Sequence, residues 1–253
     1  MPHPGWPSSG PLQSPLISPF LSIVIPAYNE EPRILETLGQ VVRFLNCRSY
    51  SWEVVIADDG STDGTAALVS DFALQYSNVR LISLPHRGKG WAVKHGMLDA
   101  AGAYCFLCDA DLSMPIEQVE RFFPPQLDGV DIAIGSREAP NSRRIGEPAQ
   151  RHTMGRMFNA LVRVLAVPGL DDTQCGFKCF RGEIVGELFQ QQTLDGFAFD
   201  VELLFLAHRS GMKIREVGID WYHRERSKVR PLQDSFAMTR DLLKIRWRHR
   251  RGR

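Results

Sequence analysis

The chain has 253 residues, of which 43% are hydrophobic and 23% are charged. This composition is typical of a globular protein, and the length allows a core that needs no support from disulfides or metals. The net charge is only +1, but from Trp221 to Arg253 eleven Lys and Arg residues stand against three Asp and Glu residues. A basic end on an acidic body indicates an anionic partner there, such as a phosphate, a membrane surface or a nucleic acid.

Residues 1–20 are rich in Pro, Ser and Gly and contain neither a charged start nor an unbroken apolar run. They lack the pattern of a signal peptide, and we expect a flexible leader. No stretch of the sequence approaches the roughly 18 uncharged apolar residues that span a bilayer, so we expect no transmembrane helix.

Residues 21–137 alternate short apolar runs with segments of helical spacing. Between Ile34 and Leu45 the apolar residues recur at helical spacing, after acids and Pro32 that are typical of a helix start. We expect strands at residues 21–29, 52–65 with its turn, 79–84, 103–110 and 130–137, and helices at residues 30–46, 64–76, 88–101 and 115–123.

The rest of the chain departs from this alternation. We expect an amphipathic helix at 148–167, a loop into a strand or hairpin at 171–182, a helix at 197–211, an alternating strand at 212–223 and a final helix at 231–253. Gly211 would form the C-cap of the helix before it.

Strands that alternate with helices predict an α/β fold with a mainly parallel, twisted sheet and helices on both faces. Ligands of such sheets bind outside the carboxyl ends of the strands. Four polar or turn-forming segments stand at these ends: Pro26–Glu30, Asp58–Ser61, Asp109–Asp111 and Gly135–Arg137. The sequence therefore predicts the functional site at this edge.

Asp109 and Asp111 follow a buried apolar run, and two like carboxylates so close are costly unless a cation neutralises them. A hard divalent ion with few protein ligands and a phosphate on its other side meets this need. The alternative is a helix N-cap, but Ser113 alone would provide that and would leave both aspartates unexplained. We therefore predict a metal site.

Two further segments indicate a nucleotide. Asp58 and Asp59 either form a turn with a helix cap or offer a carboxylate to a nucleobase N–H. The segment His86–Gly90 places glycines and cations, among them Lys89, before a helix N-terminus, which suits a diphosphate.

The five cysteines are odd in number and lack the spacing of a disulfide scaffold, which is typical of a reducing compartment. Cys105 and Cys108 fall in an expected strand, where residues three apart point to opposite faces. We therefore interpret them as small buried hydrophobes and not as zinc ligands.

Eight segments, taken together and in order, resemble the family 2 inverting glycosyltransferases: SIVIPAYNEE, VVIADDGSTDGT, GKGWAVKHGM, DADLSMP, IGSR, DTQCGFKCF, FAFDVELLFLA and EVGIDWYHRERSKV. They are most similar to the branch of dolichyl-phosphate β-glucosyltransferases and mannosyltransferases, over roughly Leu21–Trp247. The resemblance implies a GT-A-type domain at 21–230, with a nucleotide half at 21–137 and an acceptor half at 138–230. Residues 231–253 would form a basic amphipathic helix and tail.

The resemblance also assigns roles to residues. It implies a nucleotide site lined by Pro26, Tyr28, Glu30, Asp58 or Asp59, Lys89, Asp109, Ala110 and Asp111. Asp109 and Asp111 would hold Mg²⁺ or Mn²⁺ on the donor diphosphate, and Arg137 would contact a phosphate. The acceptor side would contain Gln174, Gly176, Phe177 and Lys178, and a basic loop with Arg224, Arg226 and Lys228 would close over the phosphates.

The chemistry of the acceptor decides whether a base is needed. A lipid phosphate is mostly ionised near neutral pH, so the site would need cations to overcome repulsion between two anionic substrates. Arg137, Lys178, Arg224, Arg226 and Lys228 could supply them. A hydroxyl acceptor would need a carboxylate base, for which Asp200 or Glu202 are candidates, although an ordinary polar side of a helix explains both more simply.

The last helix sets apolar residues beside basic ones, as in helices that lie on anionic membrane surfaces. A docked amphipathic helix with a frayed basic end explains the same pattern, and both interpretations stay open. The sequence has no aromatic platform or recognised motif for nucleic acid, so we expect no such partner.

We therefore expect a metal-dependent inverting enzyme, cytoplasmic and peripheral on the cytoplasmic face of a membrane. It would transfer a hexose, with glucose from UDP-glucose favoured, to a polyprenyl or dolichyl phosphate. Mannose from GDP-mannose is the alternative, but the basic loop is shorter than in the mannosyltransferases and Ser113 replaces a glutamine. A glycan hydroxyl is another possible acceptor within the family.

Two other classes remain as alternatives. A nucleotidyltransferase would share the sheet and the metal carboxylates, but it needs a glycine-rich loop where PAYNEE follows the first strand. The other alternative is a membrane-associated binding module without catalytic activity. Intact Asp109, Asp111 and the basic loop argue against it.

Overall fold

The structure is a computed structural model, and it describes residues 18–146, 162, 167–224, 240–242 and 244–249. The strands are β1 (Leu21–Ala27), β2 (Trp52–Asp58), β3 (Val79–Ser83), β4 (Tyr104–Cys108), β5 (Ile132–Ser136), β6 (Arg143–Ile145), β7 (Phe177–Arg181), β8 (Ile214–Gly218) and β9 (Asp220–Tyr222). The helices are α1 (Ile34–Asn46), α2 (Thr65–Ala73), α3 (Lys89–Asp99), the 3₁₀ helix η1 (Ile116–Phe122), α5 (Gly182–Gln190) and α6 (Phe199–Arg209). Residues 240–242 and 244–248 are also helical.

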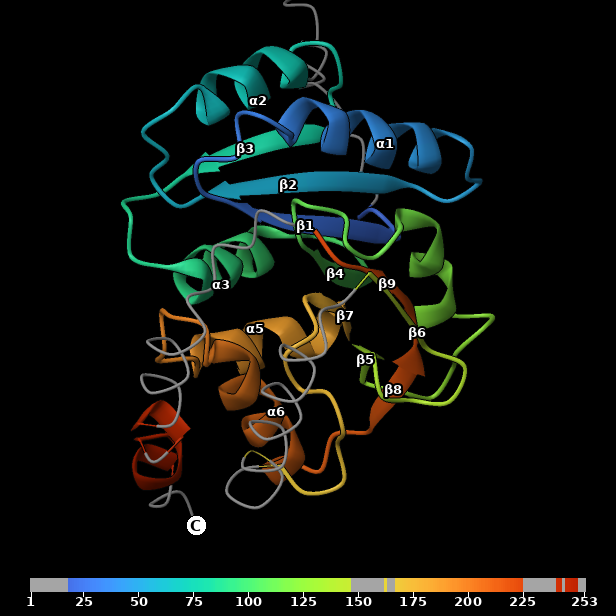
Figure 1. Ribbon diagram of the computed structural model, residues 1–253, viewed down its shortest axis with the longest axis vertical. Helices are drawn as coiled ribbons and strands as arrows, with labels where there is room; N and C mark the ends of the chain where they lie inside the picture. The colour runs from blue at the N-terminus through green and yellow to red at the C-terminus, as the bar shows by residue number, and fades with distance from the viewer. Residues whose placement is uncertain (1–17, 147–161, 163–166, 225–239, 243, 250–253) are drawn as a thin grey trace, which may run out of the picture.

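Seven strands form one sheet in the order β3-β2-β1-β4-β7-β5-β8. Only β7 among them runs antiparallel to its neighbours, β4 and β5. In Figure 1, α1 and α2 lie over one face of the sheet, and α3, α5 and α6 lie against the other. The predicted α/β fold with a mainly parallel sheet is therefore confirmed. A separate parallel pair, β6 and β9, lies beside it.

The central strands are apolar on both sides because each side has its own core. Ile23 and Ile25 pack in the cluster that contains the buried residues of α1. Val24, which points the opposite way, packs in the cluster that contains Val93 and Met97 of α3. Parallel strands covered on both faces are continuous apolar runs for this reason, which is why the sequence pattern identified β1, β2 and β4.

The structure departs from the expected elements in three places. The α-helix expected at residues 115–123 is instead the 3₁₀ helix η1 (Ile116–Phe122). The expected strand at 212–223 is interrupted after Gly218, and its second part pairs with β6. Helix α5, which contains Gly182 and Gly186, was not predicted, because glycine weakens the helical pattern. Of the expected helix at 148–167, nearly all lies outside the described residues.

Smaller predictions are confirmed. Gly211 follows α6 with a φ of 71°, as a glycine C-cap requires. All five cysteines are free, and Cys105 and Cys108 are buried in the core. Burial raises the pKa of the Cys105 thiol to about 12, which fits an inert hydrophobe.

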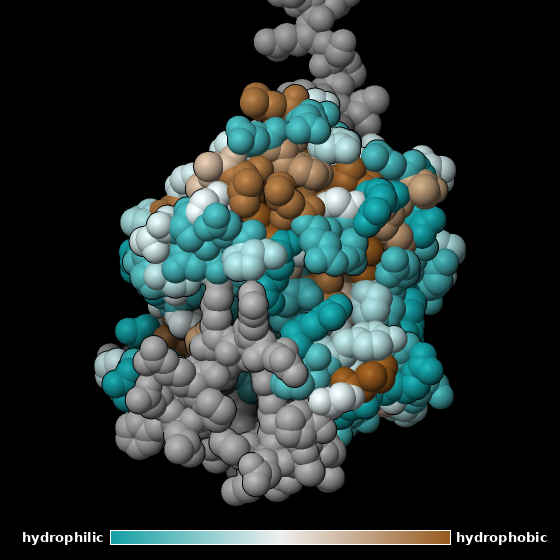
Figure 2. Space-filling model, turned by 45° about the horizontal axis from the view of Figure 1, so that its top comes forward, coloured by the Kyte–Doolittle hydropathy of each residue, from teal (hydrophilic) through white to brown (hydrophobic). Residues whose placement is uncertain are grey.

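Figure 2 shows one face of the molecule, on which hydrophilic residues predominate and hydrophobic ones gather over the region of α1 and α2. Leu35 in α1 is 44% exposed, and Leu74, directly after α2, is 87% exposed. Trp247, near the C-terminal end of the described residues, is 75% exposed.

Candidate active site

The sheet brings three of the predicted polar segments together at one edge. Strands β2, β1 and β4 are neighbours and run parallel, so their carboxyl ends meet. The segment after β1 starts at Tyr28, the one after β2 at Asp59, and the one after β4 at Asp109. The alternation of strands and helices thus correctly predicted that these segments meet, and a functional site at this edge stays a prediction.

Asp109 and Asp111 keep open carboxylate oxygens. Oδ1 of Asp109 lies 2.7 Å from Nζ of Lys89, and Oδ1 of Asp111 accepts the N–H of Ser113 at 2.8 Å. The other oxygen of each carboxylate accepts no hydrogen bond from the described residues. The Asp109 side chain is 26% exposed. Two accessible carboxylates on one turn fit the oxygen ligands that Mg²⁺ and Mn²⁺ prefer.

Gly176 leaves the space that Asp109 occupies. In the β4–β7 pair Cys108 is opposite Phe177, so the residue after the one strand faces the residue before the other. A Cβ on Gly176 would lie 2.1 Å from Oδ2 of Asp109. The expected acceptor segment therefore borders the expected metal site, and only glycine fits there without displacing the Asp109 carboxylate.

Lys89 is the first residue of α3, and its ammonium pairs with Asp109 and offsets part of the charge of the two aspartates. Burial alone would lower the pKa of its ammonium, but Asp109, Asp200 and Asp111 outweigh burial and raise that pKa. The group is therefore positively charged at neutral pH. Together with the N-terminus of α3 it offers a cationic seat for a diphosphate.

The two aspartates at the end of β2 have different partners. Both oxygens of Asp58 accept hydrogen bonds from Ser61, through its N–H at 3.1 Å and its hydroxyl. Asp59 instead accepts the N–H groups of Arg87 and Gly88, both at 2.9 Å. Asp58 thus closes its own turn, as one interpretation expected, and Asp59 holds the segment His86–Gly90, here called the glycine-rich loop, in place. A contact of either with a base stays a prediction.

The residues after β1 form the side of the site nearest to β2. The ring of Tyr28 stacks on His86, with centroids 4.1 Å apart and planes 15° from parallel. Glu30 pairs with Arg33 at 2.9 Å, and Pro26 is half-buried. Ala110 is buried, and its carbonyl accepts the hydroxyl of a threonine in α1.

Arg137 follows β5 and is held by Asp172, which begins the segment DTQCGFKCF but was given no role in the sequence analysis. Its Nε and Nη2 donate to the two oxygens of Asp172 at 2.6 and 2.8 Å. Asp172 has no exposed surface; burial raises its pKa, but the Arg137 guanidinium outweighs this and leaves that pKa below its ordinary value. The ring of Trp221 lies 5.7 Å from the guanidinium carbon. This bidentate pair fixes Arg137 at the rim of the site.

Lys178 is enclosed in the core, with 1% of its surface exposed. Its ammonium donates to Oδ1 of Asp200 and to the carbonyl of Cys175, both at 2.5 Å. The expected direct contact with a phosphate does not fit this burial. Its charge acts on the site through Asp200, whose carboxylate lies in the field of Lys89 and Asp109 as well.

Asp200 and Glu202 lie in the first turn of α6, and neither is on a solvated side of the helix. They are 4% and 0% exposed, so the interpretation as an ordinary polar side is wrong. Burial, with a smaller contribution from Asp109, raises the pKa of Asp200 despite Lys178 and Lys89. Glu202 accepts hydrogen bonds from the loop before α6. The helical pattern indicated neither set of partners.

The other expected residues fall into three groups. Gln174 is half-buried beside this edge, whereas Phe177 is fully buried and packs on Phe106 with ring centroids 4.5 Å apart. Phe177 is thus a core residue, which its apolar character could have indicated. Arg224 is exposed, and Arg226 and Lys228 lie outside the described residues.

The described part of the final helix is docked. Leu242 and Ile245 are each 1% exposed and pack in the core cluster on the α3 and α6 side of the sheet. Trp247 points outward, 75% exposed. For Leu242 and Ile245, the interpretation as a docked amphipathic helix therefore agrees with the structure. Among the described residues, no helix combines the length and hydropathy needed to cross a membrane.

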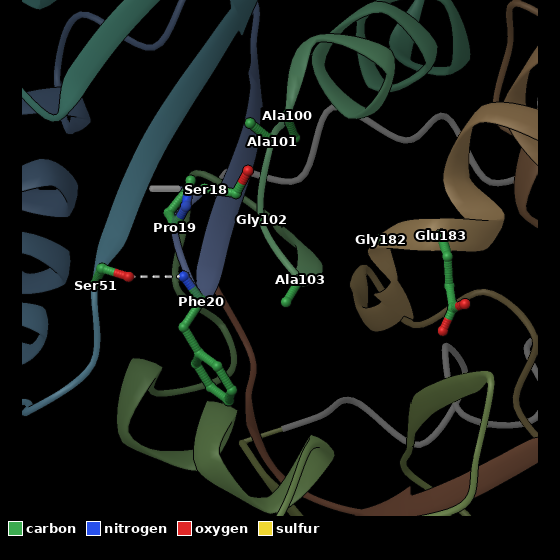
Figure 3. A pocket seen from close by; sticks show the side chains of 10 residues that line it. All are labelled: Ser18, Pro19, Phe20, Ser51, Ala100, Ala101, Gly102, Ala103, Gly182 and Glu183. Atoms are coloured by element: carbon green, nitrogen blue, oxygen red, sulfur yellow. Dashed lines mark hydrogen bonds between the residues drawn. The ribbon is translucent and has the colours of Figure 1, made fainter. Parts of the chain in front are cut away.

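A shallow pocket of about 470 Å³ lies at the opposite edge of the sheet, as Figure 3 shows. It is lined by residues that precede β1, β2 and β4 and by Gly182 and Glu183, which follow the antiparallel β7. Its lining includes none of the candidate site residues, so the pocket is separate from the candidate active site.

Comparisons with known proteins identify relatives of this chain. Residues 22–189 match the model of Glycosyl transferase family 2. The dolichyl-phosphate beta-glucosyltransferase of Dictyostelium discoideum is 35% identical over 98% of this chain and 80% of its own length. The Saccharomyces cerevisiae enzyme of the same name is 36% identical over 90% of this chain and 74% of its own length. The Homo sapiens enzyme of that name is 34% identical over 92% of this chain and 76% of its own length.

A solved structure shows the same fold. Glucosyl-3-phosphoglycerate synthase from Mycobacterium tuberculosis, in complex with Mn²⁺, UDP and glucosyl-3-phosphoglycerate, superposes with a TM-score of 0.62 and 21% identity. The match covers 90% of this chain and 78% of that one. Taken with the sequence matches, this places the chain in a known group: it belongs to glycosyl transferase family 2.

Proposed function

We propose that this protein transfers glucose from UDP-glucose to dolichyl phosphate with inversion at the sugar carbon. The observation that carries the proposal is the 35% identity, over 98% of the chain, with a dolichyl-phosphate beta-glucosyltransferase. The geometry supports it, because the polar segments expected to bind nucleotide, metal and acceptor meet at one edge of the sheet.

The donor would lie between the segments after β1 and β4. Tyr28 would face the nucleoside, and Lys89 with the N-terminus of α3 would face the diphosphate. Asp109 and Asp111 would hold Mg²⁺ or Mn²⁺, because both keep an open oxygen and Gly176 leaves room beside them. The bound ion would act as a Lewis acid that stabilises the leaving diphosphate.

The acceptor would enter past the segment before β7. A phosphate monoester is already largely ionised at neutral pH, with a second pKa of about 6, so it can attack without a strong base. Arg137, fixed by Asp172, would orient the acceptor phosphate and offset repulsion between the substrates. Asp200 is 4% exposed and bound to Lys178, which argues against its service as a base for a hydroxyl acceptor.

A lipid acceptor requires access to a membrane surface. We place this contact on the outer side of the final helix, where Trp247, Arg246 and Arg248 are exposed, and not on the buried Leu242 and Ile245. All five cysteines are free, which supports action at the cytoplasmic face.

Transfer assays with purified protein test the proposal. Vesicles that contain dolichyl phosphate are incubated with labelled UDP-glucose, UDP-galactose or GDP-mannose, with Mn²⁺, Mg²⁺ or EDTA. We expect metal-dependent glucosyl transfer to the lipid, lost in Asp111→Asn and kept in Asp71→Asn, a matched change on the exposed side of α2. A preference for GDP-mannose would refute UDP-glucose as the donor. Turnover of UDP-glucose only on hydroxyl acceptors would refute dolichyl phosphate as the acceptor.

A further inference from the structure

Glu202 of α6 is a fully buried carboxylate, which is costly unless hydrogen bonds satisfy it. Its Oε2 accepts the N–H groups of Thr193 and Leu194 at 2.9 and 2.8 Å. Its Oε1 accepts the hydroxyl of Thr193 at 2.6 Å and lies 2.9 Å from Nε2 of His249. One carboxylate thus joins the loop before α6 to His249, the last described residue of the final helix.

The loop held by Glu202, residues 192–196, lies directly on the glycine-rich loop. Nε2 of Gln192 donates to the carbonyl of Gly90 at 2.8 Å. A Cβ on Gly90 would lie 2.6 Å from the carbonyl oxygen of Leu194, and one on Gly88 would lie 2.6 Å from that of Asp195. The two backbones are therefore in contact with no side chain between them, so a shift of one moves the other.

The glycine-rich loop in turn carries the cation of the site. Lys89 lies between these two glycines, and its Nζ is 2.7 Å from Oδ1 of Asp109. Arg87, on the same loop, pairs with Asp195 at 2.6 Å. The position of the loop at 192–196 therefore sets where the Lys89 ammonium stands relative to the acidic pair.

The final helix supports this arrangement from the other side. Ile245 and Leu242 pack in the same core cluster as Leu194. Nη1 of Arg248 donates to Oγ1 of Thr193 at 2.9 Å. Thr193 thus has partners on both α6 and the final helix. The final helix therefore helps to hold the loop at 192–196 against the Glu202 carboxylate.

We infer that Glu202 is a positioning residue: with the final helix it holds the loop at 192–196 and, through it, the Lys89 ammonium at the diphosphate site. Glu202 touches no substrate. The inference rests on the proposed function, because it takes Lys89 and its loop as the seat of the donor diphosphate.

Ligand binding separates this role from a merely structural one. UDP and uridine are titrated in the presence of Mn²⁺ into wild type and Glu202→Gln, by calorimetry for UDP and ligand-observed NMR for uridine. The amide keeps the shape of the side chain but loses one acceptor oxygen. We expect UDP affinity to fall about tenfold, as when outer partners of a charged site are removed, and uridine affinity to stay unchanged.

Three variants complete the test. Glu187→Gln, an exposed carboxylate of α5, should leave both affinities unchanged. If Glu202 acts through Lys89, then Glu202→Gln should add little to the loss of UDP affinity in Lys89→Gln, a coupling that a double-mutant cycle measures. Thr193→Val removes the hydroxyl that Oε1 of Glu202 accepts, and it carries the same comparison if Glu202→Gln does not fold.

The outcomes are distinct. Equal losses for UDP and uridine, or no loss for either, would overturn the positioning role while leaving the proposed function intact. A wild-type protein that binds no UDP would instead refute the proposed donor.

Discussion

Gly176 and Asp109 share a space that holds only one side chain, because a Cβ on Gly176 would lie 2.1 Å from Oδ2 of Asp109. The obstacle is the end of a mobile side chain, so Gly176→Ala should push the carboxylate aside without unfolding the protein. We expect transfer activity to fall about a hundredfold, the order of loss that follows from misplacing a catalytic group.

The matched control for this glycine is Gly186 in α5, where a Cβ would meet nothing within 4 Å. Gly186→Ala should keep full activity and raise the free energy of unfolding by about 0.5–1 kcal/mol, the helix preference for alanine. Steady-state assays and urea unfolding measure both quantities. Full activity in Gly176→Ala would show that the position of Asp109 does not matter.

Lys89 should have opposite effects on two ligands. In the free protein its ammonium, 2.7 Å from Asp109, competes with a metal ion for that carboxylate. Lys89→Gln should therefore bind Mn²⁺ alone about tenfold more tightly and UDP about tenfold more weakly, each a difference of one charge-assisted contact. Calorimetric titrations check both, with Lys213→Gln, an exposed lysine before β8, as the control. Losses in both affinities would contradict the competition.

The candidate site could be predicted where local patterns determine it. Parallel strands fix one edge, so Tyr28, Asp59 and Asp109 could be placed together before any coordinates. The partners that hold the site could not be predicted, because each comes from a distant segment. Asp172 reaches Arg137 across 35 positions, and periodicity carries no signal for such a pair.

Charge alone also misled the assignment of roles. Lys178 was expected to contact a phosphate, and Asp200 was expected on a polar side of its helix. In the structure both are buried, and their opposite charges are paired with each other. A sequence shows that an ionisable residue is present and not whether its partner lies in solvent or in the core. The docked side of the final helix was ambiguous for a similar reason, since an amphipathic pattern suits a protein core and a membrane equally.

The Arg137–Asp172 pair should dominate acid stability near the site. Asp172→Asn leaves the guanidinium without its buried partner and should lower the free energy of unfolding at pH 7 by about 3 kcal/mol. Because Arg137 keeps the folded pKa of Asp172 below its ordinary value, the unfolded chain takes up the proton first. This stabilisation is complete above pH of about 4 and is lost as the pH falls through the folded pKa.

Urea unfolding between pH 7 and pH 3 measures this dependence. The loss of stability toward low pH should be smaller in Asp172→Asn than in wild type. The control is Asp220→Asn, which removes the carboxylate of the solvent-exposed pair with Arg143 and should change stability less. Identical pH profiles for wild type and Asp172→Asn would exclude Asp172 as the titrating group.

The two sides of the final helix should respond to different measurements. Leu242 is 1% exposed in the core, so Leu242→Ala should cost about 3 kcal/mol of unfolding free energy. Trp247 is 75% exposed, so Trp247→Ala should leave stability unchanged and reduce binding to anionic vesicles several-fold, by about the contribution of one interfacial side chain. Urea unfolding and vesicle sedimentation separate the two effects. Leu74→Ala, which removes an 87% exposed leucine after α2, controls for general loss of surface apolarity. If Trp247→Ala and Leu74→Ala sediment with vesicles as wild type does, the final helix is a structural clamp for the site and not the membrane contact.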